Sequence, residues 1–182
     1  MGFSSFIENL KPVPAFQDQT GAAIAGDWVN MKGYGGCMIF FHEMRGADAT
    51  PTVIRVDKAR DIAGANQSTG VVLRNLWHSQ DRASVTGDVG ATAAASVGAT
   101  DVFTKALATA TTFSGSVTQS VGQWVVIDVN ADDLPDATYD DYNSIQLQVV
   151  SSNAAHYMSA WYLLYNPRCA RKFADQPTAL TN

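Results

Sequence analysis

Six segments of this chain place apolar residues in the patterns of β-strands, and these patterns constrain the fold more than any other feature. They are residues 37–44, 52–58, 71–77, 123–130, 144–150 and 157–165. In 144–150, Ile145, Leu147 and Val149 alternate with two glutamines. A period of two places one face of a strand in a core and the other in solvent. Shorter strands are expected near 28–31 and 103–113.

Helical patterns are nearly absent between these segments. Only Ala131–Leu134 suggests a helical turn, and Pro135 ends it because proline has no N–H to continue a helix. Strands joined by Gly-, Asp-, Asn- and Pro-containing turns favour sheets packed on sheets over a doubly wound α/β fold. We therefore predict an all-β protein, an antiparallel β-sandwich (jelly-roll-like) with an extended N-terminal arm and a short C-terminal tail.

The 182 residues are most simply one domain, long enough to bury a core. The sandwich is expected to span residues 27–168. Residues 1–26 combine prolines with scattered apolar residues and are interpreted as an arm outside the core, and residues 169–182 as a tail. Residues 83–120 are rich in Ala, Thr, Ser and Gly, and Val-Gly-Ala-Thr occurs there twice. This composition suits either a disordered segment or a long ordered segment outside the sandwich. Valines spaced through it favour the ordered segment, which could add edge strands to a partner.

Charge and hydropathy argue against several partners. The chain has 12 Lys and Arg against 17 Asp and Glu, a net charge of −5, which argues against a nucleic-acid surface. Its longest apolar runs are too short to cross a membrane, and residues 1–16 lack the basic start and apolar stretch of a signal peptide. Cys37 and Cys169 are expected to be free thiols in a reducing cytoplasm, with a disulfide as the less favoured alternative.

Residues that could carry chemistry form no recognisable site. The candidates are His42, His78, His156, Asp132-Asp133 and Asp140-Asp141. The histidines lack the close pairing that places two imidazoles on one metal, and the aspartates lack the ligand order of a calcium loop, so structural and turn roles are favoured. Gly33–Gly36 precedes a strand without a following Lys and Ser/Thr, which indicates a tight turn rather than a phosphate loop. We therefore predict a non-enzymatic protein that needs no metal or cofactor.

Four tryptophans allow two interpretations: Trp28, Trp77, Trp124 and Trp161. They could line a sugar-binding face, or they could fill the core. Each lies within or beside an apolar strand pattern, and in residues 71–77 the pattern places Trp77 inward. Core packing is therefore favoured, and replacing Trp161 or Ile127 with alanine is expected to cost about 3–5 kcal/mol as a core truncation.

The segment AWYLLYNPRC, residues 160–169, is apolar on both faces and ends abruptly. Pro167 cannot donate a hydrogen bond to a neighbouring strand, so it ends the ladder. A strand of this kind belongs in the middle of the sandwich, or has its outer face covered by a neighbouring subunit.

The order of four stretches carries a family resemblance. DWVNMKGYGGCMIFFHEM is followed by ATPTVIRVDKARDIAGANQSTGVVL, then by WVVIDVNADDLP, and finally by LYNPRCARKF. Over residues 27–168 this order resembles small structural proteins encoded in the head genes of tailed phages and prophages, described as minor capsid, cement or decoration proteins. The matching residues after the first stretch are Ala59, Asp61, Ala63, Gly64, Ile127, Val129, Ala131, Leu134, Asn166, Pro167 and Arg168.

The resemblance implies a virion structural protein, made in the host cytoplasm, that binds the outside of the assembled capsid and stabilises it. Its partner would be the major capsid protein. It would act as a homo-oligomer, most simply a trimer, without nucleic acid or membrane. A carbohydrate-binding β-sandwich module and a tail or neck structural protein are the alternatives.

Contact residues are expected at the two ends of the chain. Phe3, Phe6 and Phe16 give the arm more apolar surface than a free segment should expose. The tail contains basic residues suited to an acidic surface on a partner: Arg168, Arg171 and Lys172. Removal of residues 1–20 is accordingly expected to leave a folded protein that binds capsids poorly.

Overall fold

Eleven strands and one short 3-10 turn appear in the computed structural model, which describes residues 10–44, 50–79, 103–106, 110–115 and 123–167. The strands are β1 (Leu10–Thr20), β2 (Ile24–Ala25), β3 (Val29–Asn30), β4 (Tyr34–Met44), β5 (Val53–Ala59), β6 (Asn75–Ser79), β7 (Phe103–Ala106), β8 (Thr112–Ser114), β9 (Gln123–Asn130), β10 (Ser144–Ser151) and β11 (Tyr157–Pro167). The turn is η2 (Ala131–Asp133).

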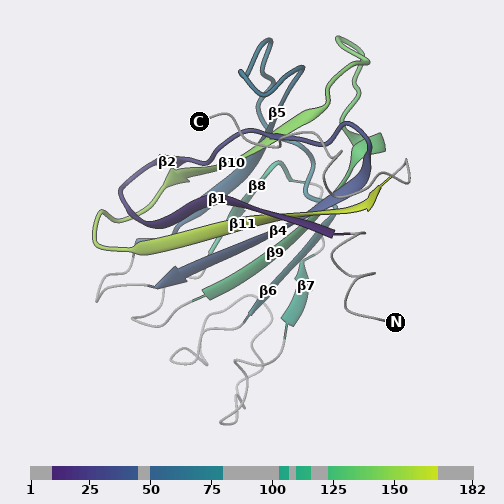
Figure 1. The fold of residues 1–182 in the computed structure, drawn as a ribbon. Coiled ribbons are helices and arrows are strands. Elements are labelled where there is room, and N and C mark those ends of the chain that lie inside the picture. The colour runs from purple at the N-terminus through teal and green to yellow at the C-terminus, as the bar shows by residue number, and fades with distance from the viewer. Residues whose placement is uncertain (1–9, 45–49, 80–102, 107–109, 116–122, 168–182) are drawn as a thin grey trace.

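The strands form two antiparallel sheets packed face to face (Figure 1). Sheet A has the order β1-β11-β4-β9-β6-β7. Sheet B has the order β2-β10-β5-β8, and β3 also pairs with β10. The predicted antiparallel β-sandwich is therefore confirmed.

The core lies between the sheets and consists of residues at alternate strand positions. In sheet A, one inward row crosses five adjacent strands, and each member is at most 4% exposed: Val13, Tyr162, Ile39, Ile127 and Leu76. Sheet B contributes Ile54, Val56, Ile145, Leu147 and Val149, each at most 1% exposed. Full burial of one large apolar side chain contributes about 1.5–3 kcal/mol, so these rows account for much of the driving force for folding.

Tyr162 joins the two sheets through its hydroxyl group. The backbone N–H of Leu147 on β10 donates to Tyr162 Oη at 2.8 Å, and the hydroxyl donates to the carbonyl oxygen of Asp27 at 3.0 Å. Complete burial raises the pKa of Tyr162 well above its usual value. The hydroxyl therefore stays protonated and can serve as donor and acceptor at once.

Residues 10–25, which were expected to belong to an arm outside the core, lie within the sandwich instead. β1 pairs with β11 along the edge of sheet A, from Leu10 opposite Tyr165 to Thr20 opposite Tyr157. Pro12 and Pro14, which suggested a non-strand segment, are tolerated because an edge strand has one side without a hydrogen-bonding neighbour. The strand is also irregular near Phe16. Only residues 1–9 of the expected arm lie outside the described residues.

Several local predictions agree with the structure. β9 has the predicted bounds, and η2 falls at the predicted helical turn before Pro135. The glycine-rich turn is confirmed, since Gly33 has a φ of +90° and the Tyr34 N–H donates to the Met31 carbonyl oxygen at 2.9 Å. Most of the 83–120 segment lies outside the described residues. Within it, β7 pairs with β6 and β8 pairs with β5.

A partly buried ion pair holds the turn after η2 against sheet B. Lys58 Nζ on β5 lies 2.7 Å from Asp136 Oδ2 and also donates to the carbonyl oxygen of Leu134 at 2.7 Å. The hydrogen bond from Lys58 is the main reason that the pKa of Asp136 falls from 3.8 to about 2.

This ion pair predicts a loss of stability in acid. Because the pKa of Asp136 is lower in the folded state, its contribution is complete above the unfolded value and is lost as pH falls through about 2. Urea unfolding of the wild type and Asp136→Asn should therefore differ by a constant amount above about pH 5, and the difference should shrink between about pH 4 and pH 2. A difference that persists unchanged at the lowest pH would contradict an ionic origin.

Candidate protein-interaction surface

The outward positions of sheet B are polar. Arg55 and Asp57 on β5 form a bidentate ion pair with N···O distances of 2.8 and 3.0 Å. They are the cross-strand partners of Gln148 and Gln146 on β10, whose side chains hydrogen bond to each other. An antiparallel sheet with one face on a core normally alternates in this way between apolar inward and polar outward residues.

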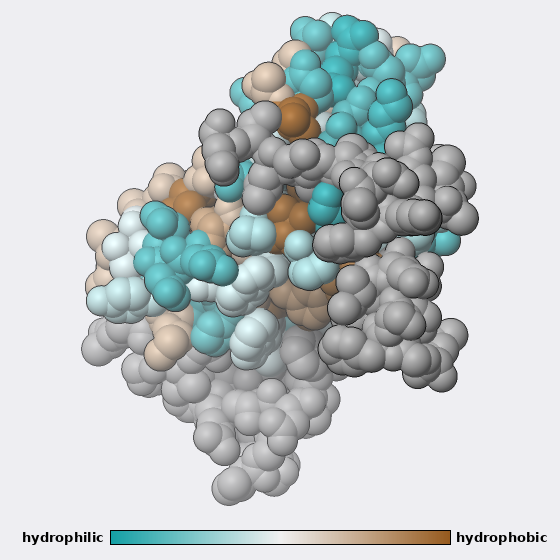
Figure 2. Space-filling view, viewed as in Figure 1, coloured by the Kyte–Doolittle hydropathy of each residue, from teal (hydrophilic) through white to brown (hydrophobic). Residues whose placement is uncertain are grey.

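The outward positions of sheet A break this rule. One row is apolar across five adjacent strands, and we call it the apolar row: Pro14, Trp161, Phe40, Val126 and Trp77. Each member is the direct cross-strand partner of the next, so their Cβ atoms are about 4.5–5.5 Å apart and the side chains form a continuous strip. The proline is exposed and the other four are half-buried. Figure 2 shows hydrophobic side chains in the middle of one side of the molecule, the side of sheet A that faces the viewer in Figure 1.

More apolar side chains extend this surface toward one end of sheet A. Met44 and Tyr157 are cross-strand partners and are 58% and 61% exposed. Between them and the apolar row, His42 stacks on Trp124 with the ring centroids 4.3 Å apart. Burial lowers the pKa of His42, which leaves the imidazole neutral near pH 7. This end of the face is therefore aromatic and uncharged at the described residues of β4, β9 and β11.

The opposite end of the same face is polar. Tyr165 Oη on β11 donates to Asp128 Oδ1 on β9 at 2.7 Å, reaching across β4. The ring fits because β4 has Gly36 at this point, where a Cβ atom would lie 2.2 Å from Tyr165 Oη. Asp128 is the only charged outward residue on β4, β9 and β11. An apolar centre with a polar margin is the general anatomy of a protein–protein interface.

None of the four tryptophans lies in the core, so the core prediction is wrong for all of them. Trp77, Trp124 and Trp161 are on the outward face of sheet A, and Trp28 is half-buried beside Gly64. For residues 71–77 the error is one of register, because β6 begins at Asn75 and a shift of one residue exchanges the two faces. In β11 both faces are apolar, so alternation does not identify the inward one. In β9 alternation correctly predicts that Val125, Ile127 and Val129 point inward and Asp128 outward, and the same alternation places Trp124 outward. Because Trp161 is half-buried on the outward face, the loss of stability predicted for replacing a core residue does not apply to it.

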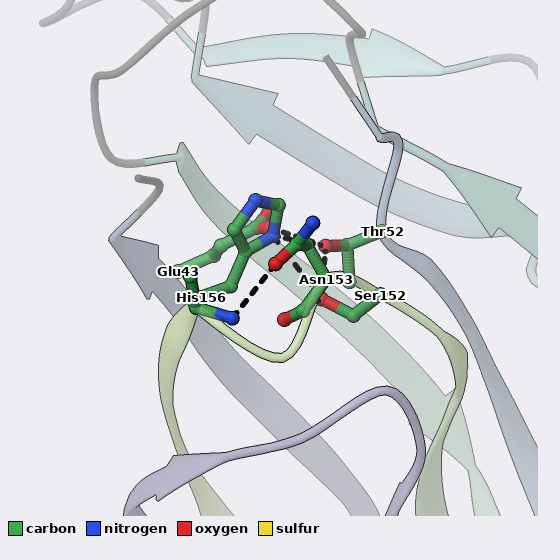
Figure 3. A network of polar contacts seen from close by, with 6 residues as sticks. Glu43, Thr52, Ser152, Asn153 and His156 are labelled. Carbon is green, nitrogen blue, oxygen red and sulfur yellow. Dashed lines mark hydrogen bonds and ion pairs between the residues drawn. The ribbon is translucent and has the colours of Figure 1, made fainter. Parts of the chain in front are cut away.

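A buried polar cluster closes one end of the sandwich (Figure 3). Glu43 Oε1, from β4, lies 2.8 Å from His156 Nδ1, and Thr52 Oγ1 donates to the same carboxylate oxygen. Ser152 Oγ lies 3.1 Å from His156 Nδ1 and 3.0 Å from Thr52 Oγ1. These four residues are at most 8% exposed. The cluster thus joins β4 of sheet A to the segments that flank β5 and β10 of sheet B.

The geometry of this cluster differs from that of a catalytic triad. In a triad the imidazole directs one ring nitrogen to the carboxylate and the other to the nucleophile. Here Glu43 Oε1 and Ser152 Oγ approach the same nitrogen, Nδ1 of His156. This arrangement offers no path for a proton from the hydroxyl through the ring. Together with its burial, it favours a structural role for the cluster.

The predicted contact residues are not brought together among the described residues. Phe16 is 9% exposed and packs edge-on against Phe41 with ring centroids 6.5 Å apart, so it is a core residue and not the interface residue that was predicted. The other five predicted contact residues lie outside the described residues: Phe3, Phe6, Arg168, Arg171 and Lys172.

The remaining candidate residues have structural contacts. His78 is 7% exposed and lies against Phe113 with ring centroids 5.3 Å apart. Asp133 forms an ion pair with Arg74 at 3.3 Å, and Asp141 accepts from Arg60 at 2.7 Å. The neighbouring Asp132 lies in η2, and Asp140 is exposed.

Cys37 is a fully buried free thiol whose pKa is raised by burial, whereas Cys169 lies outside the described residues. Across the part of the chain that the structure describes, no group of three or more His, Cys, Asp or Glu is placed to hold a metal ion. The same part contains no helix that is long and apolar enough to span a membrane.

Comparison with known proteins yields little. No protein-family model and no curated protein sequence matches this chain. Among solved structures, the SPBc2 prophage-derived protein YomS shows some similarity, with a TM-score of 0.41 and 9% sequence identity over 86% of this chain and 92% of YomS. Similarity at this level does not establish a common fold or function.

Proposed function

We propose that this protein is a non-enzymatic structural protein of a tailed-phage virion that binds the outside of the assembled capsid and stabilises it. Its partner is the major capsid protein. Two independent observations support the proposal. The order of sequence motifs over residues 27–168 resembles that of head-gene structural proteins, and the outward face of sheet A is suited to protein contact.

The outward face of sheet A is the observation that carries the proposal. A contiguous apolar surface on a protein marks a place where another surface binds. In the buried cluster, Glu43 Oε1 and Ser152 Oγ approach the same ring nitrogen of His156, which differs from the arrangement of a catalytic triad and favours a structural role. This combination fits a protein that acts by binding.

Purified virions test the capsid function directly. Particles produced from the genome that encodes the chain should contain it in numbers comparable with the major capsid protein, as measured by gradient purification and quantitative mass spectrometry. A chain without residues 1–9 should remain folded but bind these capsids at least about 100-fold more weakly, because Phe3 and Phe6 would each contribute about 1.5–3 kcal/mol when buried.

The two measurements have separate contradicting outcomes. Absence of the chain from purified capsids would contradict the capsid function. Equal binding by the full chain and by the chain without residues 1–9 would exclude the arm from the contact and leave the rest of the surface as the candidate.

A carbohydrate-binding module is the second candidate function. The specific observation in its favour is that Trp77, Trp124 and Trp161 share one outward face. Aliphatic neighbours such as Val126 and Met38 give this face few polar groups for sugar hydroxyls. Protein contact is therefore the better-supported use of the same surface.

A further inference from the structure

The outward face of sheet A has a composition that points to its occupant. We propose that a second copy of this chain covers this face, with the apolar row of one copy packed against that of the other. The inference rests on the proposed function only in treating the protein as one that acts by contact. It assigns this face to contact between copies, so the assembled copies would bind the capsid through other surfaces.

The difference between the two sheets is the first argument. Sheet B places Arg55, Asp57 and Gln146 on its outward face, where Asp57 and Gln146 are 3% and 8% exposed and the chain itself supplies polar partners. Sheet A instead places Trp161 next to Phe40 and Val126 next to Trp77. Burying such side chains removes apolar surface from water, which favours an assembled state over the exposed one.

The size of the face is the second argument. Five adjacent strands at a spacing of about 4.8 Å make the apolar row roughly 20 Å long. Along β11, the outward positions from Tyr157 to Tyr165 extend about 27 Å at the rise of an antiparallel strand. The projected area is about 500 Å², and accessible area exceeds projected area on a rough surface. Specific, stable protein–protein interfaces of standard size bury about 800 Å² per partner, which is of the same order.

Charge and shape together select a second copy as the partner. The chain has a net charge of −5, so copies repel one another in general. On this face the only charged outward residue of β4, β9 and β11 is Asp128, which lies away from the apolar row and is hydrogen bonded to Tyr165. Lys105 on β7 is the cross-strand partner of Trp77, so the uncharged part of the row ends at β6. Flat sheets pack face to face, and a two-fold axis makes one apolar face complementary to itself. The outward face of sheet A on a second copy therefore supplies a complementary partner surface.

The test is the oligomeric state of the isolated full chain, measured by light scattering and sedimentation over a range of concentrations. The wild type should have at least twice the mass of one chain. The double variant Trp77→Thr/Trp161→Thr should have the mass of a single chain at the same concentrations. Threonine suits outward strand positions, so the fold should persist. Far-UV circular dichroism and the urea midpoint check this.

Two further variants make the test specific. The matched control, Val72→Thr/Val150→Thr, removes two apolar side chains that are each 41% exposed and lie outside the apolar row, and it should keep the wild-type mass. Val126→Lys places a charge in the middle of the apolar row and should also give single chains. This variant decides the outcome if the tryptophan variant fails to fold.

Two results would overturn the inference. One is a wild type that remains a single chain at all concentrations. The other is an oligomer that persists in both Trp77→Thr/Trp161→Thr and Val126→Lys. Binding of a single-chain wild type to insoluble cellulose or chitin through Trp77 and Trp161 would likewise overturn it and favour a sugar-binding face. These measurements use no capsids. Their failure therefore leaves the capsid function standing, and absence from virions would leave this inference standing.

Discussion

Removing residues 1–20 is expected to abolish the stable fold, which corrects the expectation from the sequence that a folded protein would remain, whereas removing residues 1–9 should leave the fold intact. The longer deletion removes β1, which carries Val13, Ala15 and Phe16 into the core at 2–9% exposure. Burial of the valine and phenylalanine alone contributes about 3–6 kcal/mol. A domain of this size is stable by only about 5–15 kcal/mol in total.

Loss of β1 has a second consequence for sheet A. β11 is paired on both sides in the full chain, and the longer deletion turns it into an edge with unpaired N–H and C=O groups. An exposed, largely apolar edge strand favours aggregation. Near-UV circular dichroism and urea unfolding of both truncated chains measure the effect. A cooperative transition with an unchanged midpoint after removal of residues 1–20 would show that β1 is not part of the stable sandwich.

Replacing Glu43 with alanine is expected to lower the free energy of unfolding by about 3–5 kcal/mol, and replacing His156 should cost about the same. Either change leaves polar groups of the buried cluster without the partner that they contact in the folded state. The penalty for an unsatisfied buried polar group exceeds the net gain from a typical hydrogen bond.

A double-mutant cycle separates this effect from general disruption. Because the two residues share one cluster, Glu43→Ala/His156→Ala should cost little more than either single change. The exposed pair of Arg60 and Asp141 is a control, since Arg60→Ala should leave the free energy of unfolding nearly unchanged. Urea unfolding at neutral pH measures all four variants. Additive costs for Glu43 and His156 would contradict the coupling.

The fold class could be read from the sequence because its signals are local. Ile145, Leu147 and Val149 alternate with polar residues, and this alone requires a strand with one buried face. Pro135 predicted the end of a helical turn because proline has no N–H to continue a helix. Gly33 lies in the predicted tight turn before β4, where its positive φ suits glycine. The prolines of β1 misled the same reasoning, because their acceptability depends on the strand lying at an edge, which is a property of the whole sheet.

The sequence by itself therefore determined most of the strands, the sandwich and the inward face of β10, whereas only the tertiary structure decided that β1 belongs to the sandwich and which face of β11 is inward. Trp161 and Phe40 are far apart in the chain and become neighbours only through strand order and register. The same holds for Glu43 and His156. Alternation shows that a strand has two faces, but along most of β11 both faces are apolar. Which one is buried depends on where the second sheet packs, because burial is a property of the assembled layers and not of the local chain.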